Sequence, residues 1–211
     1  MGGYTHLIWD WNGTLLNDLG WCVRVVNGLL ERRKLPLLGG AEDYHRVFCF
    51  PIIEFYRNVG FDLEGEGFAP IAEEYIREYH AGDDLCPLQP GAAELLELAE
   101  QKGIAQVILS ASEQSNLERQ VDRYGIRRHF SRLLGISDIY AKSKQAVGMR
   151  YMEEERPERA LLVGDTLHDW EVAKALGADC VLVSTGHNSR EMLLTAGVPV
   201  LDGLEQLAAY L

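Results

Sequence analysis

The sequence predicts an α/β fold in which a doubly wound parallel sheet carries an inserted, all-helical cap. Short apolar runs alternate with amphipathic segments along most of the 211 residues, which is typical of a parallel sheet covered by helices on both faces. The alternation stops between residues 17 and 86, where apolar and charged residues recur at helical spacing only. A chain of this length, 47% hydrophobic, can bury one sizeable core and a smaller lobe.

Six apolar runs bounded by glycine or polar residues are the expected strands. They are residues 4–10, 104–110, 132–136, 160–165, 180–184 and 198–201. Helical spacing lies between them, and several of these segments end near glycine, as helices often do. The expected helices of the core are residues 92–101, 113–124, 144–155, 169–176, 189–195 and 204–210.

The interrupted stretch is expected to form the cap. Helical spacing runs through residues 19–33, 42–58 and 69–80, and Pro90-Gly91 marks the return to alternating strands and helices. We therefore divide the chain into an α/β core, residues 1–16 and 87–211, and a helical cap, residues 17–86.

Charge and composition exclude several classes of protein. A formal charge of −12 argues against a nucleic-acid or anionic-membrane surface, since phosphates are bound through clustered Lys and Arg. The four cysteines are scattered without C-x-x-C spacing, which predicts reduced thiols rather than a zinc site or a disulfide framework. No apolar run approaches the roughly 20 residues of a membrane span, and no leader pattern opens the chain. We expect a cytoplasmic protein.

Polar residues follow the first expected strand at the point where it would leave the sheet. Asp10 ends the run Leu7-Ile8-Trp9, and Asn12-Gly13-Thr14 comes next. A carboxylate at the carboxyl end of a strand can act as a nucleophile and a metal ligand, while a glycine turn and a threonine hydroxyl can receive a phosphate.

Three further segments add candidate residues to the same edge. Ser110 closes the second expected strand, where a hydroxyl and neighbouring backbone N–H groups can cradle a phosphate. Lys142 or Lys144 offers an ammonium that can neutralise a phosphoryl group and an attacking carboxylate. Asp165 and Asp169 lie four residues apart around a strand end and helix start, and oxygen ligands of this kind suit Mg²⁺.

Each of these residues has a plain structural interpretation. Asp10 can simply end a strand, Asp169 can cap a helix, Ser110 can be a turn residue, and a lysine is usually solvated. The joint order, strand-Asp-x-x-Gly-Thr, strand-Ser, Lys at a helix start and strand-Gly-Asp-x-x-x-Asp, is what favours a site.

These motifs together resemble the haloacid dehalogenase superfamily, in its phosphatase branch with a small helical cap, similar to phosphoglycolate phosphatases. The resemblance covers essentially the whole chain and implies a Rossmann-like core. It implies that Asp10 is the nucleophile that becomes an aspartyl-phosphate, and that Thr14, Ser110 and Ala111 bind phosphate oxygens. It also implies that Lys144 bridges nucleophile and phosphate, a choice over Lys142 because Val147 and Tyr151 follow at helical spacing.

The same resemblance implies a Mg²⁺ ion bound by Asp10, Asp165, Asp169 and the backbone carbonyl of Asn12. The implied Mg²⁺ ion argues against a dehalogenase, because the dehalogenases of this superfamily work without a metal ion. The implied substrate is a small phosphorylated metabolite, and the implied assembly is a monomer or a homodimer.

One residue departs from the family pattern. Phosphatases of the family carry Asp two residues after the nucleophile, where it protonates the leaving alcohol and activates water, but here the residue is Asn12. An amide can do neither, and loss of a positioned acid or base forfeits about 10² to 10⁴ in rate.

Several hypotheses therefore stay open. The chain is a slow or specialised phosphatase in which water, the substrate or a cap residue such as His45 replaces the acid, or it is a phosphate-ligand binder or regulator without turnover. A third is phosphonate hydrolysis, which in that family needs a cap lysine, and Lys34 is the only lysine in residues 17–86. Deamidation of Asn12-Gly13, or an engineered change from Asp, would also account for the amide.

The cap is expected to choose the substrate, because a lobe inserted after the nucleophile can close over the site. We expect His45 and Arg46 to contact the substrate, and Arg57 could bind a substrate carboxylate. Backbone-satisfied burial of His45 and surface pairing of the arginines are the plain alternatives. His187 lies beyond the fifth expected strand, where a turn role is expected.

Overall fold

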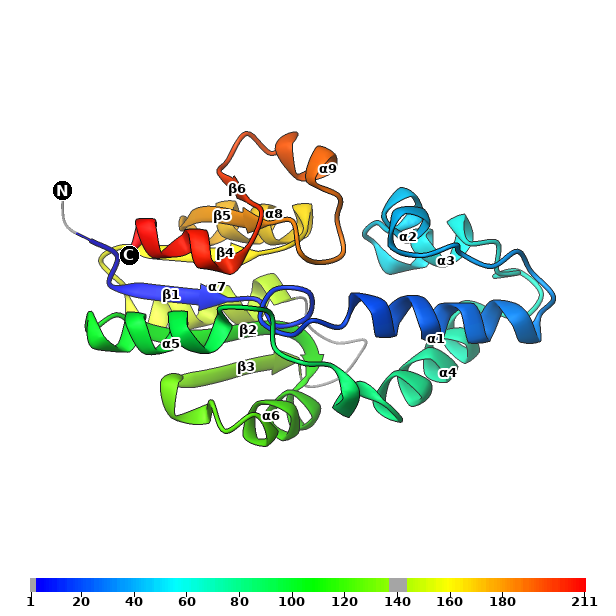
Figure 1. Cartoon of the computed structure of the whole chain (residues 1–211), viewed down its shortest axis with the longest axis horizontal. Helices are drawn as coiled ribbons and strands as arrows, with labels where there is room; N and C mark the ends of the chain where they lie inside the picture. Colours follow the sequence, from blue (N-terminus) through cyan, green and yellow to red (C-terminus); the bar gives the residue numbers. More distant parts are fainter. Residues whose placement is uncertain (1–2, 137–143) are drawn as a thin grey trace.

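The computed structural model describes residues 3–136 and 144–211, and a parallel sheet runs through its centre. Every neighbouring pair of strands is parallel, so all carboxyl ends lie at one edge. The arrowheads in Figure 1 accordingly point toward the helices of residues 19–80. In spatial order the strands are β3 (Arg132–Ile136), β2 (Ala105–Glu113), β1 (His6–Trp9), β4 (Ala160–Gly164), β5 (Asp179–Val183) and β6 (Val200–Leu201).

Helices cover both faces of the sheet. Successive residues of a strand point to opposite faces, so a strand contributes side chains to the packing on both sides. In β1, Leu7 and Trp9 join one apolar cluster and Ile8 joins another. The first cluster includes residues of α5 (Ala92–Gln101), α6 (Gln114–Arg123) and the 3₁₀ helix η3 (Leu204–Tyr210). The second includes residues of α7 (Lys144–Glu155) and α8 (Leu167–Leu176). The predicted doubly wound α/β fold is confirmed.

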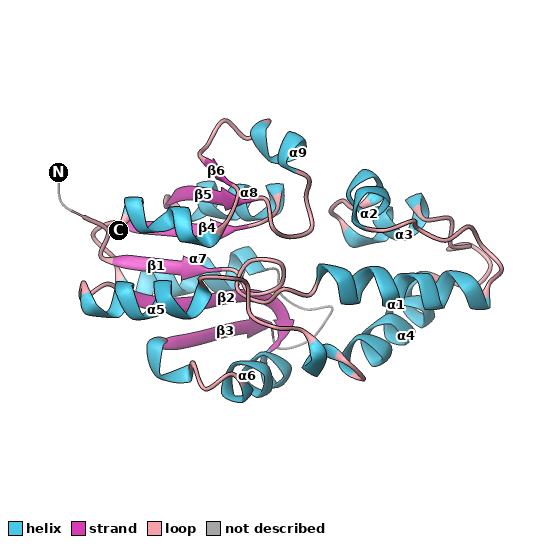
Figure 2. Ribbon diagram, in the orientation of Figure 1, coloured by secondary structure: helices cyan, strands magenta, loops and turns pink. Residues whose placement is uncertain are grey.

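Between β1 and α5 the described chain forms helices and loops, as Figure 2 shows. The helices are α1 (Leu19–Arg32), α2 (Ala41–Val47), α3 (Ile52–Asn58), α4 (Phe68–His80) and the 3₁₀ helix η1 (Asp83–Leu85). They pack around their own apolar cluster, with Val26 and Leu29 of α1 against Tyr44, Phe55 and Ile71. A second core of this kind is what a helical cap requires; its division from the rest at residues 17 and 86 stays a prediction.

Several expected elements differ from the observed ones; the second strand, for example, continues past Ser110 to Glu113. Residues 42–58 form two helices, because Phe48 is extended and Pro51, which lacks an N–H, can only begin the next helix. Residues 204–210 form a 3₁₀ helix rather than an α-helix. A short 3₁₀ helix η2 (Arg127–His129) precedes β3, and α9 (Arg190–Leu194) precedes β6. Among the described residues no helix is long and apolar enough to cross a bilayer.

The position of β1 determines where a site can form. The chain passes from β1 to β2 on one side, while β4 pairs with the other side of β1. A parallel sheet opens a crevice at the carboxyl ends of strands where its winding direction changes. Residues that follow β1 and β4 therefore meet at this crevice.

Replacement of Gly148 by Ala should destabilise the core. A Cβ at this position of α7 would lie 2.8 Å from a methyl of Leu109 and 3.0 Å from a methyl of Leu176. Forcing a methyl into a packed contact typically costs about 1–3 kcal/mol. Gly20→Ala is the matched control, because no heavy atom lies within 4 Å of such a Cβ in α1, and the helix gains up to about 1 kcal/mol. Urea denaturation measures both, and equal stabilities would contradict tight packing of α7.

Candidate active site

Asp10 lies directly after β1, with its backbone N–H donating to the carbonyl of Val163 in β4 at 2.9 Å. Its buried carboxylate is ion-paired with Lys144, the first residue of α7. The Lys144 Nζ also lies 2.5 Å from Oδ1 of Asp169 in α8. One ammonium thus joins the residue that follows β1 to two helices on one face of the sheet.

The turn after Asp10 brings a hydroxyl to the carboxylates. Gly13 has φ of +76°, and a Cβ there would lie 2.3 Å from Oδ2 of Asp165, so the turn needs glycine on both counts. Thr14 Oγ1 donates to Oδ1 of Asp165 at 2.8 Å and lies 3.2 Å from Oδ2 of Asp10. Thr14 therefore connects two of the acids.

Asp169 has both a structural and an electrostatic environment. It is the third residue of α8, and its Oδ2 accepts from the backbone N–H of Thr166 at 3.0 Å and from the Thr166 hydroxyl at 2.6 Å. The two residues form a capping box, so the plain interpretation of Asp169 as a capping residue is partly correct. Its other oxygen faces Lys144.

The charges of this cluster do not balance. Asp10, Asp165 and Asp169 each bring an oxygen within 4.8 Å of the others, and Lys144 is the cation between them. Burial raises the pKa of Asp10 well above its ordinary value, only partly offset by Lys144, and burial also raises the pKa of Asp165. Burial opposes ionisation of Asp169 too, but Lys144 outweighs it and lowers that pKa. Fully ionised, the group would carry a net charge of −2, which a divalent cation would balance.

A cavity of about 290 Å³ opens onto these residues. Ser110 and Ala111, near the end of β2, line it together with Asp10, Lys144 and Asp165. The Ser110 hydroxyl accepts from the backbone N–H of Ser112 at 3.0 Å. The structure therefore brings the predicted phosphate-binding and carboxylate residues to one place. Lys142, the alternative to Lys144, lies outside the described residues.

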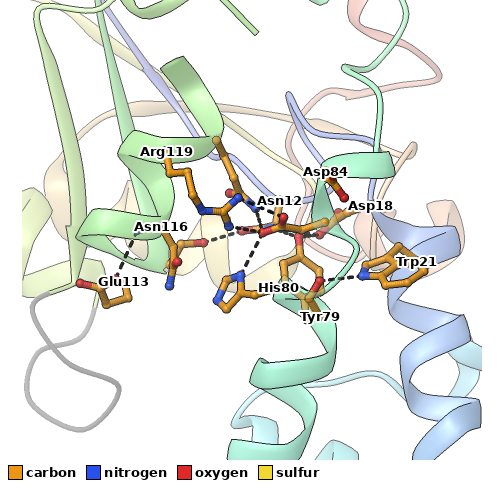
Figure 3. A network of polar contacts seen from close by, with 12 residues as sticks. Asn12, Asp18, Trp21, Tyr79, His80, Asp84, Glu113, Asn116 and Arg119 are labelled. Atoms are coloured by element: carbon orange, nitrogen blue, oxygen red, sulfur yellow. Dashed lines mark hydrogen bonds and ion pairs between the residues drawn. The ribbon is translucent and has the colours of Figure 1, made fainter. Parts of the chain in front are cut away.

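Asn12 has its side-chain amide committed to the protein. Its Nδ2 donates to Oδ2 of Asp18 at 2.8 Å and lies 2.8 Å from the hydroxyl oxygen of Tyr79, while its Oδ1 accepts from the hydroxyl of Ser112 at 2.8 Å. Figure 3 shows Asn12, Asp18 and Tyr79 meeting where the end of α4 approaches the motif. An Asp at position 12 would set a carboxylate oxygen against Asp18, so this environment favours an amide.

Asp18 is a residue that sequence reasoning missed. It is 1% exposed, and it accepts from the backbone N–H of Gly13 at 2.9 Å and from the Tyr79 hydroxyl at 2.6 Å. Burial opposes its ionisation, but His187 with Nε2 at 3.4 Å, Tyr79 and Asn12 lower its pKa overall. The available signal was an acid only six residues after Asn12.

His187 has more than the expected turn role. Its backbone N–H donates to Oδ2 of Asp165 at 2.7 Å, and its ring pairs with Asp18 and contacts the Tyr44 hydroxyl at 3.1 Å. Burial lowers the pKa of its ring, but Asp18, together with Asp165 and Asp10, outweighs burial and raises the pKa to about 9. A charged histidine thus balances the buried carboxylate.

The predicted cap contacts are placed elsewhere. His45 Nε2 lies 2.9 Å from the carbonyl oxygen of Gly186, which is the backbone-satisfied alternative. Arg46 pairs with Asp43 and has a side chain 70% exposed, and Arg57 pairs with Glu54 on the surface. None of the three lines the cavity.

Exchanging the residues at positions 12 and 18 should reveal their coupling. Asn12→Asp places a half-buried carboxylate against the buried Asp18, and loss of the hydrogen bond with an uncompensated charge should lower the free energy of unfolding by about 1–3 kcal/mol at pH 8. Asn12→Asp/Asp18→Asn restores an amide-carboxylate pair and should recover most of that loss. A double-mutant cycle in urea measures the coupling, and purely additive effects would contradict it.

His187 should stabilise the fold in a pH-dependent way. Because its pKa is raised to about 9 in the folded state, its contribution is complete below about pH 6.5 and disappears as the pH rises through 9. The difference in unfolding free energy between the wild type and His187→Gln should therefore be larger at pH 6 than at pH 9.5. In an Asp18→Asn background, the effect of His187→Gln on the unfolding free energy should no longer change with pH. If it changes with pH as before, Asp18 is not the cause of the pH dependence.

The chain is similar in sequence to known proteins. A family model described as haloacid dehalogenase-like hydrolase matches residues 7–183. A phosphoglycolate phosphatase from Synechococcus elongatus is 28% identical over 196 residues, 90% of this chain and 88% of that protein. The tyrosine-protein kinase PtkA of Mycobacterium tuberculosis is 28% identical over 191 residues, 89% of this chain and 64% of that protein.

The fold is shared with solved structures. A haloacid dehalogenase-like hydrolase from Streptococcus pneumoniae superposes with a TM-score of 0.82 at 19% identity, over 100% of this chain and 99% of that one. At this identity the likeness is one of fold. The family model spans well over half of the sequence and includes Asp10, Ser110, Lys144, Asp165 and Asp169. This chain belongs to the haloacid dehalogenase-like hydrolases.

Proposed function

We propose that this chain is a Mg²⁺-dependent phosphatase that acts on a small phosphorylated metabolite through an aspartyl-phosphate on Asp10. The observation that carries the proposal is the Lys144 ammonium between Asp10 and Asp169, at a cavity that Ser110 also lines. The relatives named above support it, since a phosphatase and a kinase both transfer phosphoryl groups.

A magnesium ion fits the donor set. Asp10, Asp165 and Asp169 supply carboxylate oxygens within 4.8 Å of one another, and the backbone carbonyl of Asn12 is the further ligand that we propose. Hard oxygen donors and an excess negative charge are what Mg²⁺ requires. When bound, the ion supplies charge neutralisation for the phosphoryl group and the nucleophile.

The residues of the chain then divide the reaction between them. A carboxylate oxygen of Asp10 attacks phosphorus, and the bond from phosphorus to the alcohol oxygen breaks as the aspartyl-phosphate forms. Lys144 neutralises the charge that collects between Asp10 and the transferred group, while Thr14, Ser110 and Ala111 orient its oxygens. Water then attacks phosphorus, the bond to Asp10 breaks, and inorganic phosphate leaves.

The leaving alcohol is handled without a carboxylic acid at position 12. The Asn12 amide is engaged by Asp18, Tyr79 and Ser112, so it is held in place rather than free to contact a substrate. Water or the substrate itself must supply and remove the protons. We therefore propose turnover about 10² to 10⁴ slower than a positioned acid would allow.

A second function, binding of a phosphate ligand without turnover, is favoured by the same amide. The carboxylates, Lys144 and the cavity are sufficient to bind an anion with its cation, whereas Asn12 cannot transfer a proton. Phosphonate hydrolysis has less support, because the Lys34 side chain does not line the cavity. The choice between monomer and homodimer stays a prediction.

Phosphate release from a chromogenic monoester tests the proposal. With Mg²⁺ the wild type should turn over slowly, and EDTA or Asp10→Asn should abolish the signal because the cation site or the nucleophile is lost. If the protein folds, Asn12→Asp should raise kcat at least tenfold. Asp18 should raise the pKa of the introduced carboxyl group, which can then retain a proton and give it to the leaving alcohol.

The controls separate the two functions. Wild-type activity that survives Asp10→Asn would refute the aspartyl-phosphate. Calorimetric binding of inorganic phosphate with Mg²⁺, without turnover in either the wild type or Asn12→Asp, would favour the binding function instead.

A further inference from the structure

The cavity over Asp10 is apolar on its cap side. Phe48 and Phe50 lie between α2 and α3, and Ile52 and Phe55 lie on α3; all four line it. The Phe48 and Phe55 ring centroids are 5.3 Å apart, and those of Phe48 and Phe50 are 5.5 Å apart. Tyr44 continues this wall, with its ring stacked on Phe48 at 5.1 Å.

Two of the tyrosines that line the cavity have their hydroxyls bonded to the protein. The Tyr44 hydroxyl meets Nδ1 of His187, and the Tyr79 hydroxyl donates to Asp18. The cap side of the cavity is therefore formed mainly of ring faces and aliphatic groups, and Tyr56 and Tyr75 line it as well. Aromatic faces of this kind favour another ring at a centroid distance of about 4.5–7 Å.

Charged groups in the cavity disfavour a second anion. Among residues 3–136 and 144–211, the basic side chains that line it are Lys144, His80, His168 and His187. Lys144 faces Asp10 and Asp169, His187 faces Asp18, and His80 Nδ1 lies 2.9 Å from Asp83.

One further histidine and two acids line the same cavity. The His168 ring is stacked on Phe50, with the two ring centroids 4.7 Å apart. The acids Asp18 and Glu113 also line the cavity. A substrate carboxylate would meet carboxylates and rings, and among the described residues that line the cavity Lys144 is the only lysine or arginine.

The cavity is also small. Its volume is about 290 Å³, and an apolar cavity of roughly 150 Å³ is enough for a benzene ring. The space therefore accommodates a phosphoryl group and one ring.

We propose that the site takes a phosphate monoester of an uncharged, single-ring aromatic alcohol, with the phosphoryl group at Asp10 and Lys144 and the ring among Phe48, Phe50 and Phe55. This inference rests on the phosphatase proposed above. The proposed substrate differs from phosphoglycolate, in which the alcohol part of the ester carries a carboxylate.

Binding to the Asp10→Asn protein tests the inference without turnover. Calorimetry with Mg²⁺ should show phenyl phosphate bound at least about tenfold more tightly than phosphoglycolate, whose carboxylate loses water without gaining a partner. Equal affinities, or tighter binding of phosphoglycolate, would overturn it.

Substitutions in the wall locate the ring. Ile52→Lys adds a cation and should reduce the preference for phenyl phosphate about tenfold or more, whereas the matched control Ile52→Met should leave it unchanged. Phe50→Ala, at a ring 44% exposed and stacked on His168, should weaken phenyl phosphate alone and covers the case in which Ile52→Lys does not fold. An unchanged preference in the folded variants would overturn the assignment of the ring to this wall.

Turnover distinguishes the two proposals. Wild-type protein that binds phenyl phosphate selectively but releases no phosphate from any monoester would refute the phosphatase and retain the selectivity. Wild-type protein that hydrolyses phosphoglycolate faster than phenyl phosphate would retain the phosphatase and refute the aromatic substrate.

Discussion

The site depends on the ion pairs that the Lys144 ammonium makes with Asp10 and Asp169. Lys144 lies between Asp10 after β1 and Asp169 at the start of α8 and is itself the first residue of α7, so three elements share one buried cation. Buried charges are tolerated only when they are paired. Burial alone would lower the pKa of Lys144, yet the two carboxylates outweigh it and raise that pKa. The same arrangement leaves the carboxylates with more negative charge than one lysine balances, which is why an oxygen-bound cation suits the cluster.

A second buried charge accounts for the amide of Asn12. Asp18 occupies the position to which Asn12, Gly13, Tyr79 and His187 all turn a donor. Two carboxylates at this spacing would not both ionise, so the acid at 18 and the amide at 12 belong together. Tyr79 comes from α4, and this contact therefore ties the motif to the cap. One hydrogen-bonded network therefore holds the amide at position 12 and contacts α4 of the helical insertion.

The cap lines the cavity mainly with apolar rings, beside Asp18 and His80. Its arginines form surface pairs, as Arg46 does with Asp43 and Arg57 with Glu54, while Phe48, Phe50 and Phe55 face the cavity. Phe50 also stacks on His168 of α8 at 4.7 Å, which brings cap and core together beside the carboxylates. Ionic groups therefore line the cavity on the sheet side, and ring faces line much of the other side.

The sequence by itself determined the alternation of strands and helices, the insertion, and the order of Asp10, Thr14, Ser110, Lys144, Asp165 and Asp169, because periodicity and motif spacing are local properties of the chain. It also predicted α5 and α7 to the residue. The break of residues 42–58 at Pro51 and the 3₁₀ geometry of residues 204–210 were less readable. Only the tertiary structure decided that Asp18 and Tyr79 contact Asn12, that His187 pairs with Asp18, and that His45 and Arg46 lie outside the cavity. These contacts join segments up to 169 residues apart (18 and 187), and no local pattern encodes their pairing.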